Sequence, residues 1–300
     1  MLDSRLGRVV YLLVRNDLVW RRLSHEERAR VLTANAVVNT TREDWSPETY
    51  GGLRTTGSET WDSDHSRQDT DKGTALLEVL SERRPRSVLE VGPGSGFYTR
   101  TICECDSVTR YTAIDINGGF LEYLRPRLDR FAGQAGRPFS FELICDDFRQ
   151  RSFVAPFDLV VLLSTVHHIP DRVDLFAYLC AATAEGGAIF CYEPSHYLPR
   201  LRKLVRKCLR PGYPKAGSIS THHMCSFGEF RKIARRVPDL ALDRTWCVCS
   251  DRVNRHPVAR HSDLARRWMS YEIGALFGKK AAGHRPTVEA NPITEATATK

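Results

Sequence analysis

Short apolar runs alternate with helix-type patterns through the middle of the chain. The apolar runs predict strands at residues 88–91, 110–115, 138–144, 157–163 and 188–192. Apolar residues at helical spacing predict helices over residues 69–83, 98–105, 120–131 and 174–183. The run at 157–163 is apolar almost throughout, as expected for a central strand buried on both faces of a sheet. This alternation predicts an α/β fold built on a parallel sheet.

The chain before residue 69 has two different patterns. Residues 2–32 carry apolar positions at helical spacing, and Ser24 with Glu27 has the spacing of a capping box that opens a second helix. Residues 41–68 are rich in Gly, Ser, Thr and Asp, yet they contain several aromatic side chains. We interpret residues 1–68 as a helical extension whose aromatic residues serve a function, because surface loops seldom carry so many without one. The alternative is that its aromatic residues only pin the extension to the core.

The chain after residue 194 departs from the strand–helix alternation. Residues 196–210 are basic and amphipathic and lie in an expected insertion at about 195–225. Further elements are expected at 230–237 (helix), 242–249 (strand), 263–268 (short helix) and 271–280 (strand). The last twenty residues offer little to bury, so we expect disorder there. The predicted organisation is 1–68, a main domain at 69–280, and a tail at 281–300.

Composition narrows the class of protein. The 300 residues include 42% hydrophobic and 27% charged residues, enough for one large domain. We find no apolar run of about 18 residues and no signal peptide, and the nine cysteines are scattered, so a cytoplasmic location is expected. The C-x-C pairs do not have zinc-knuckle spacing, so we predict no metal. The net charge of +8 leaves nucleic acid and an anionic membrane surface open, but dispersed surface arginine explains it better.

A glycine-rich turn follows the first strand. Glu90 precedes three glycines at alternate positions, 92, 94 and 96, and a helix can begin directly after them. The dinucleotide fingerprint G-x-G-x-x-G would need glycine at Phe97, so a nicotinamide cofactor is disfavoured. An acid just before the loop also suits a cationic ligand better than a pyrophosphate. Ligands of such sheets bind at the carboxyl ends of the strands.

The pattern E-x-G-x-G-x-G resembles the first motif of class I S-adenosylmethionine-dependent methyltransferases, and the resemblance extends over residues 87–194. It includes an acid ending the second strand, an acid after the third, F-D-L-V in the fourth, H-H-x-x-D after it, a G-G turn, and E-P ending the fifth. In order, these parts stand at Asp115, Asp146, 157–160, His167 with His168 and Asp171, 186–187, and Glu193 with Pro194. The similarity is greatest to small-molecule methyltransferases, which implies a Rossmann-like, seven-stranded, mostly parallel sheet with helices on both faces.

The resemblance implies S-adenosylmethionine as cofactor, with S-adenosylhomocysteine as product. Glu90 would orient the methionyl amino group, Asp115 the ribose, and residues around Asp146 the adenine. The cofactor-binding residues expected are Glu90, Gly92, Gly94, Gly96, Asp115, Ile116, Asp146, Asp147, Phe148 and Ser164. The resemblance also implies that the last part of the extension, residues 41–68, forms a lid over the active site. The substrate-binding residues expected from this lid and from the insertion are Tyr50, Trp61, His65, His196 and His222.

A general base is expected at the end of the fourth strand, because a histidine there titrates near neutral pH. His168 is the first candidate and His167 the second, while the H-H-x-x-D motif leaves open that one of them is structural. Ser164 and Thr165 stand where adenine and glutamine-amide methyltransferases carry N/D-P-P-Y, which argues against those acceptors.

The leading hypothesis is methylation of an oxygen or nitrogen atom of a small molecule, a specialised metabolite. An RNA methyltransferase and a non-catalytic S-adenosylmethionine-binding protein are the alternatives, although the chain has no RNA-binding module that we can identify. A homodimer and a peripheral membrane contact by residues 196–210 are left open.

Overall fold

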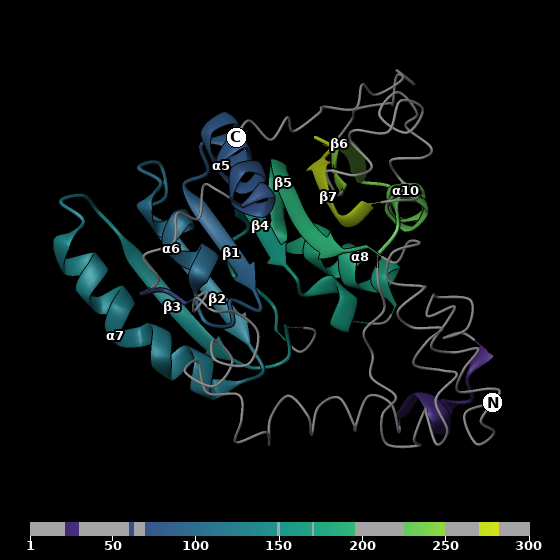
Figure 1. Ribbon diagram of the computed structural model, residues 1–300, viewed down its shortest axis with the longest axis horizontal. Helices are drawn as coiled ribbons and strands as arrows, with labels where there is room; N and C mark the ends of the chain where they lie inside the picture. Colours follow the sequence, from purple (N-terminus) through teal and green to yellow (C-terminus); the bar gives the residue numbers. More distant parts are fainter. Residues whose placement is uncertain are drawn as a thin grey trace.

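A seven-stranded sheet organises the residues that the computed structural model describes, which are 22–29, 60–62, 70–148, 151–169, 171–195, 225–249 and 270–281 (Figure 1). The strand order is β3-β2-β1-β4-β5-β7-β6. Strand β7 runs antiparallel to β5 and β6, and the other neighbouring pairs are parallel. The strands are β1 Ser87–Val91, β2 Arg110–Asp115, β3 Ser140–Cys145, β4 Phe157–Leu163, β5 Thr183–Pro194, β6 Leu240–Cys249 and β7 Ser270–Lys279.

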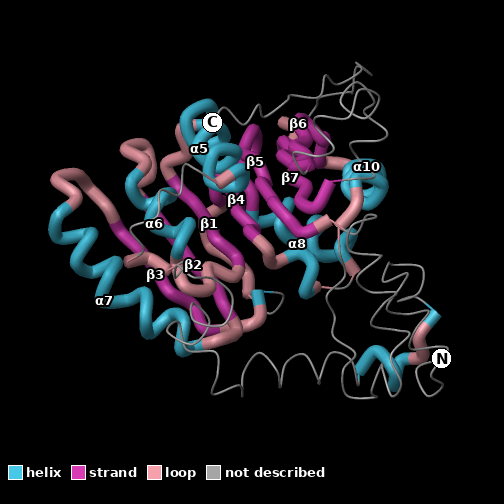
Figure 2. Tube along the Cα trace, viewed as in Figure 1, coloured by secondary structure: helices cyan, strands magenta, loops and turns pink. Residues whose placement is uncertain are grey.

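Helices cover both faces of this sheet (Figure 2). On one face lie α5 Asp71–Arg83, α6 Phe97–Glu104 and α7 Gly118–Gln134; on the other lie α8 Arg172–Ala182 and α10 Phe227–Arg236. In β4, Leu159 and Val161 join the first layer, whereas Val160 and Leu162 join the second. This alternation explains why the whole strand is apolar. The predicted Rossmann-like α/β class is confirmed.

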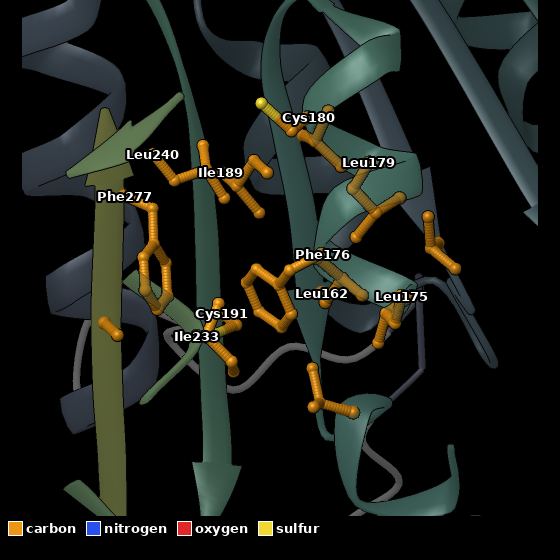
Figure 3. Packing of buried hydrophobic residues seen from close by; sticks show 14 of the residues in the cluster. Leu162, Leu175, Phe176, Leu179, Cys180, Ile189, Cys191, Ile233, Leu240 and Phe277 are labelled. Atoms are coloured by element: carbon orange, nitrogen blue, oxygen red, sulfur yellow. The ribbon is translucent and has the colours of Figure 1, made fainter. Parts of the chain in front are cut away.

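Buried apolar side chains, most of them aliphatic, fill the core between the sheet and α8 (Figure 3). Phe176 of α8 meets Phe277 of β7 with ring centroids 4.9 Å apart, and Leu162 of β4 and Ile189 of β5 are buried beside them. Truncating a buried phenylalanine of this kind costs about 3–5 kcal/mol. The central strands are thereby fixed in position, and so are the loops at their carboxyl ends.

The predicted capping box at Ser24 is present. The Ser24 backbone N–H donates to Glu27 Oε2 (3.0 Å), and the Glu27 N–H donates to Ser24 Oγ (3.1 Å). Ser226 caps α10 by accepting the N–H of Glu229 at 3.2 Å. This helix therefore begins at Phe227, three residues before the predicted start, because the cap fixes its first turn.

Strand β5 is longer than the sequence pattern predicts. It begins at Thr183 instead of residue 188, although the expected turn at 185–187 interrupts its pairing. Phe157 pairs with Thr183, and Leu159 already pairs with Ala188, so residues 184–187 bulge opposite Asp158. A bulge breaks the period of two, which is why the hydrophobic pattern missed the first part of the strand.

Several predicted segments lie outside the described residues: most of the lid at 41–68, the basic segment 196–210, the short helix at 263–268 and nearly all of the tail. The division into 1–68, 69–280 and 281–300 therefore stays a prediction. Within the described ranges, no helix is long and apolar enough to cross a membrane.

Candidate active site at the carboxyl edge of the sheet

The glycine loop between β1 and α6 leaves its backbone open. Gly94 has φ +53°, a conformation that suits glycine, and a Cβ placed there would meet no atom within 4 Å. A Cβ on Gly92 would instead lie 2.8 Å from Thr165 Oγ1, and one on Gly96 would overlap Leu124. Gly94 is therefore the loop glycine whose missing side chain faces open space, and a ligand can approach the backbone there.

Asp115 ends β2 directly beside this loop. Its Oδ1 accepts the backbone N–H of Asn117 at 2.9 Å, and its Oδ2 lies 3.5 Å from the N–H of Gly94. Burial raises the pKa of Asp115 to about 6, while these N–H groups act in the opposite direction. The carboxylate is thus held at the loop and keeps further lone pairs for hydroxyl donors.

Glu90 lies deeper than its predicted role implies. Its side chain is 2% exposed, and its Oε2 accepts the hydroxyls of Tyr111 at 2.6 Å and Thr99 at 2.7 Å. Burial raises the pKa of Glu90 to about 7, with Asp115 adding a smaller effect in the same direction. Both hydrogen bonds reach one oxygen, so Oε1 is the atom through which Glu90 could serve a ligand.

The predicted adenine-binding residues gather after β2 and β3. Ile116 is 40% exposed, which is unusual for a large apolar side chain in this core. Asp146 accepts the N–H of Asp147 at 2.8 Å and pairs with Arg151 at 2.7 Å, while Phe148 is buried. An apolar surface thus lies beside a fixed carboxylate at the same edge of the sheet.

The two histidines that follow β4 have different surroundings. Nδ1 of His167 lies 2.7 Å from Oε2 of Glu193, which is fully buried at the end of β5. The Glu193 carboxylate also accepts the backbone N–H groups of Thr165 and Val166, each at 2.8 Å. The His168 ring is half-buried and stacks on that of His167 with centroids 4.0 Å apart. His167 is therefore the histidine that a carboxylate orients.

Burial acts against ionisation of Glu193. It raises the pKa of this carboxyl, although the N–H groups of Val166 and Thr165 and the charges of Lys72 and His168 lower it. The donors around Glu193 are those that an ionised carboxylate would need in a dry site. In the sequence Glu193 is recognisable only as part of the E-P pair, because its hydrogen-bond partners follow a different strand.

The sequence pattern did not indicate Lys72 as a site residue. It lies in the first turn of α5, and its Nζ donates to Ser164 Oγ at 2.6 Å. Ser164, which was predicted as a cofactor residue, has φ +57° and follows β4 directly. The only indication in the sequence is that a lysine stands on the side of this helix where the other residues are buried.

The structure brings one of the five predicted substrate-binding residues into view. Trp61 is 7% exposed, and its backbone N–H donates to the carbonyl of Ser95 in the glycine loop at 3.1 Å. Its ring packs on Phe131 of α7, and neighbouring Asp62 pairs with Arg127. For Trp61 these contacts fit the pinning alternative better than an open lid. The other four, Tyr50, His65, His196 and His222, lie outside the described residues.

The described residues include no cluster of three or more His, Cys, Asp or Glu side chains arranged to bind a metal ion. The polar groups described above at the carboxyl edge of the sheet are carboxylates, backbone N–H groups, two imidazoles and one ammonium. Such a set suits a polar organic ligand with hydroxyl groups and a charged end.

Comparison with known proteins finds a family model that matches the central part of the chain. Residues 89–189 match the family model described as "Methyltransferase domain". The chain is 27% identical over 127 residues to the reducing polyketide synthase Preu2 of Preussia isomera, and 29% identical over 133 residues to the highly reducing polyketide synthase Preu5 of the same organism. Each match covers 41% of this chain, and the chain spans only about 5% of either protein.

A solved structure shares the fold. The magnesium protoporphyrin IX methyltransferase of Synechocystis PCC 6803, crystallised with S-adenosylhomocysteine, matches with a TM-score of 0.50 and 14% identity. The match covers 71% of this chain and 83% of that one.

Proposed function

Because residues 89–189 match a methyltransferase-domain model, we propose that this chain is a class I S-adenosylmethionine-dependent methyltransferase that methylates an oxygen or nitrogen atom of a small molecule, a specialised metabolite. The observation that carries this proposal is the edge of the sheet, where Asp115, the open Gly94 and the His167–Glu193 pair lie at the ends of adjoining strands. The similarity to two proteins named polyketide synthases supports a small-molecule acceptor that is a specialised metabolite.

The residues present fit the cofactor. The absent side chain at Gly94 leaves room for a ligand against the loop, and Asp115 beside it offers acceptors for ribose hydroxyls. Ile116 offers an exposed apolar surface for the adenine ring, and Asp146 lies at the end of the neighbouring strand for its amino group. When bound, the sulfonium supplies a methyl carbon that is already electrophilic.

The work of the chain is then mainly positioning. Holding two reactants in line can supply much of the rate of such a transfer. Asp115 and the loop backbone would hold the adenosine half, and Oε1 of Glu90 would face the methionyl amino group, directly or through a water molecule. The acceptor would approach from the β4 side, where the turn after Leu163 carries the two histidines.

We propose His167 as the base that takes the acceptor's proton, with Glu193 as its positioning residue. With the imidazole proton on Nδ1, where the Glu193 carboxylate would accept it, Nε2 would be the basic nitrogen of His167. A carboxylate behind the ring also stabilises the imidazolium once the proton has moved. His168, the first candidate from sequence, stacks on this ring and would shape the approach to it.

The test is release of S-adenosylhomocysteine by the purified protein with S-adenosylmethionine and pools of phenols, carboxylic acids and amines, beside total RNA. Turnover with a small-molecule pool and none with RNA is the expected result. Turnover with RNA alone, or none with any pool despite cofactor binding, would contradict the proposal. For the base, His167→Gln should lose most turnover and keep cofactor affinity, whereas His168→Gln should retain the larger part of turnover.

A further inference from the structure

A buried lysine at the active-site edge has no role in the proposed function. The side chain of Lys72 is only 11% exposed. Lysine is almost never buried to this degree without a partner, because an ammonium group loses its hydration there. The position of Lys72 therefore needs a reason.

The described surroundings satisfy this ammonium only in part. Nζ donates one hydrogen bond, to Ser164 Oγ at 2.6 Å, and lies 4.0 Å from Oε1 of Glu272, beyond hydrogen-bond length. The rings of Tyr98 and Tyr192 flank it, with centroids 5.6 and 5.8 Å away. Aromatic faces stabilise a desolvated cation but offer it no oxygen acceptor. Of three N–H donors, the described residues thus engage one, and an incoming oxygen could take the others.

The place of Lys72 in the sheet indicates which ligand it serves. Strand β1, with the glycine loop, lies between β2 and β4. Asp115 marks the β2 side of that loop, and Ser164, to which Lys72 donates, marks the β4 side. The side chain of Thr165, the next residue, packs against Gly92 of the loop. Lys72 and Asp115 therefore stand on opposite sides of the glycine loop.

We propose that Lys72 is the cation that pairs with the carboxylate at the methionyl end of the cofactor, so that Asp115 and Lys72 hold the two ends of one ligand. The cofactor's amino acid end carries an ammonium and a carboxylate. Glu90 offers an acid for the first, and Lys72 offers the donors for the second. The contact with Ser164 keeps Nζ at the end of β4 until the ligand arrives. This inference rests on the cofactor site of the proposed function.

The experiment compares two ligands that differ only in the carboxylate. S-Adenosylhomocysteine is one, and S-adenosyl-3-thiopropylamine, which keeps the adenosine, sulfur and amine, is the other. Calorimetric titration of the full chain should give at least about tenfold tighter binding of the first, as expected for a charge-assisted hydrogen bond in a dry site. In Lys72→Met this preference should vanish, through a loss of affinity for S-adenosylhomocysteine alone.

Lys280→Met is the matched control, because Lys280 lies at the opposite end of the sheet and its Nζ donates to the carbonyl of Pro238, far from the glycine loop. It should keep the full preference. Lys72→Gln is the second variant if Lys72→Met does not fold.

A preference that survives in the Lys72 variants would overturn the proposal, and so would an equal loss of affinity for both ligands, which indicates a structural role. Failure of the wild-type protein to bind S-adenosylhomocysteine would overturn the cofactor site itself, and the two failures are therefore distinguishable.

Discussion

The imidazole of His167 and the carboxylate of Glu193 form a buried pair, with Nδ1 2.7 Å from Oε2. Glu193 ends β5, and His167 lies in the short turn Val166–His168 after β4. The same carboxylate accepts backbone N–H groups of that turn. The end of one strand thus fixes the loop that follows its neighbour.

Glu193→Ala should lower the free energy of unfolding by about 3 kcal/mol or more, because it leaves buried donors without an acceptor. Urea unfolding at pH 7 measures the change. Glu185→Ala is the control, since Glu185 is exposed on the same strand. Equal stability of the two variants would show that Glu193 does not organise the turn.

Two glycines of the loop should respond differently to alanine. Gly94→Ala should fold with a cost of about 1–2 kcal/mol for its positive φ, yet bind S-adenosylhomocysteine at least about tenfold more weakly, because the new methyl group projects into the ligand's space. Gly96→Ala should cost about 2 kcal/mol or more in stability, since its methyl group would overlap the buried Leu124. Thermal unfolding and calorimetry of both variants test the contrast, and an unchanged affinity in Gly94→Ala would refute it.

Glu90 should make stability depend on pH. Its pKa is raised from an ordinary 4.5 to about 7, so the folded state holds a proton that the unfolded chain releases above pH 4.5. The unfolding free energy of the ligand-free protein should therefore be highest below pH 4.5 as far as this group is concerned. It should fall by about 3 kcal/mol as pH rises to 7 and beyond.

Glu90→Gln should flatten this slope, because the amide oxygen still accepts from Tyr111 and Thr99 but does not ionise. Part of the slope should remain, since the pKa of Asp115 is raised to about 6 and acts in the same direction. Glu104→Gln, at an exposed ion pair with Arg100, should leave the slope unchanged. Identical slopes in the wild type and Glu90→Gln would contradict the prediction.

Asp115→Asn should weaken binding of S-adenosylhomocysteine by about tenfold or more, because hydrogen bonds to a charged group are lost. In the wild type, affinity should decline as pH falls through about 6, where this carboxylate takes up a proton. The decline should be smaller in Asp115→Asn, where Glu90 with its pKa of about 7 still titrates, and unchanged in Asp129→Asn, which alters an exposed position of α7. Calorimetry between pH 5 and 8 decides the matter.

Hydrophobic pattern alone located the central elements. The apolar run at 157–163 gave both ends of β4, and the acid at position 115 gave the end of β2. The hydrophobic pattern predicted the ends of elements less well where tertiary contacts decide them. Strand β5 begins five residues before its predicted start, because its pairing with β4 shifts at a bulge.

The sequence by itself determined the strand–glycine turn–helix unit and the acids that end the strands, because these depend on local periodicity and on residues a few positions apart. Only the tertiary structure decided that Lys72 donates to Ser164, 92 residues later in the chain. It also decided that the Glu193 carboxylate pairs with the ring of His167, which lies 26 residues earlier in the chain. Such pairs carry no local signal, since each partner alone is an ordinary polar residue. They arise because parallel strands bring their carboxyl ends to one edge, where buried charges must find partners.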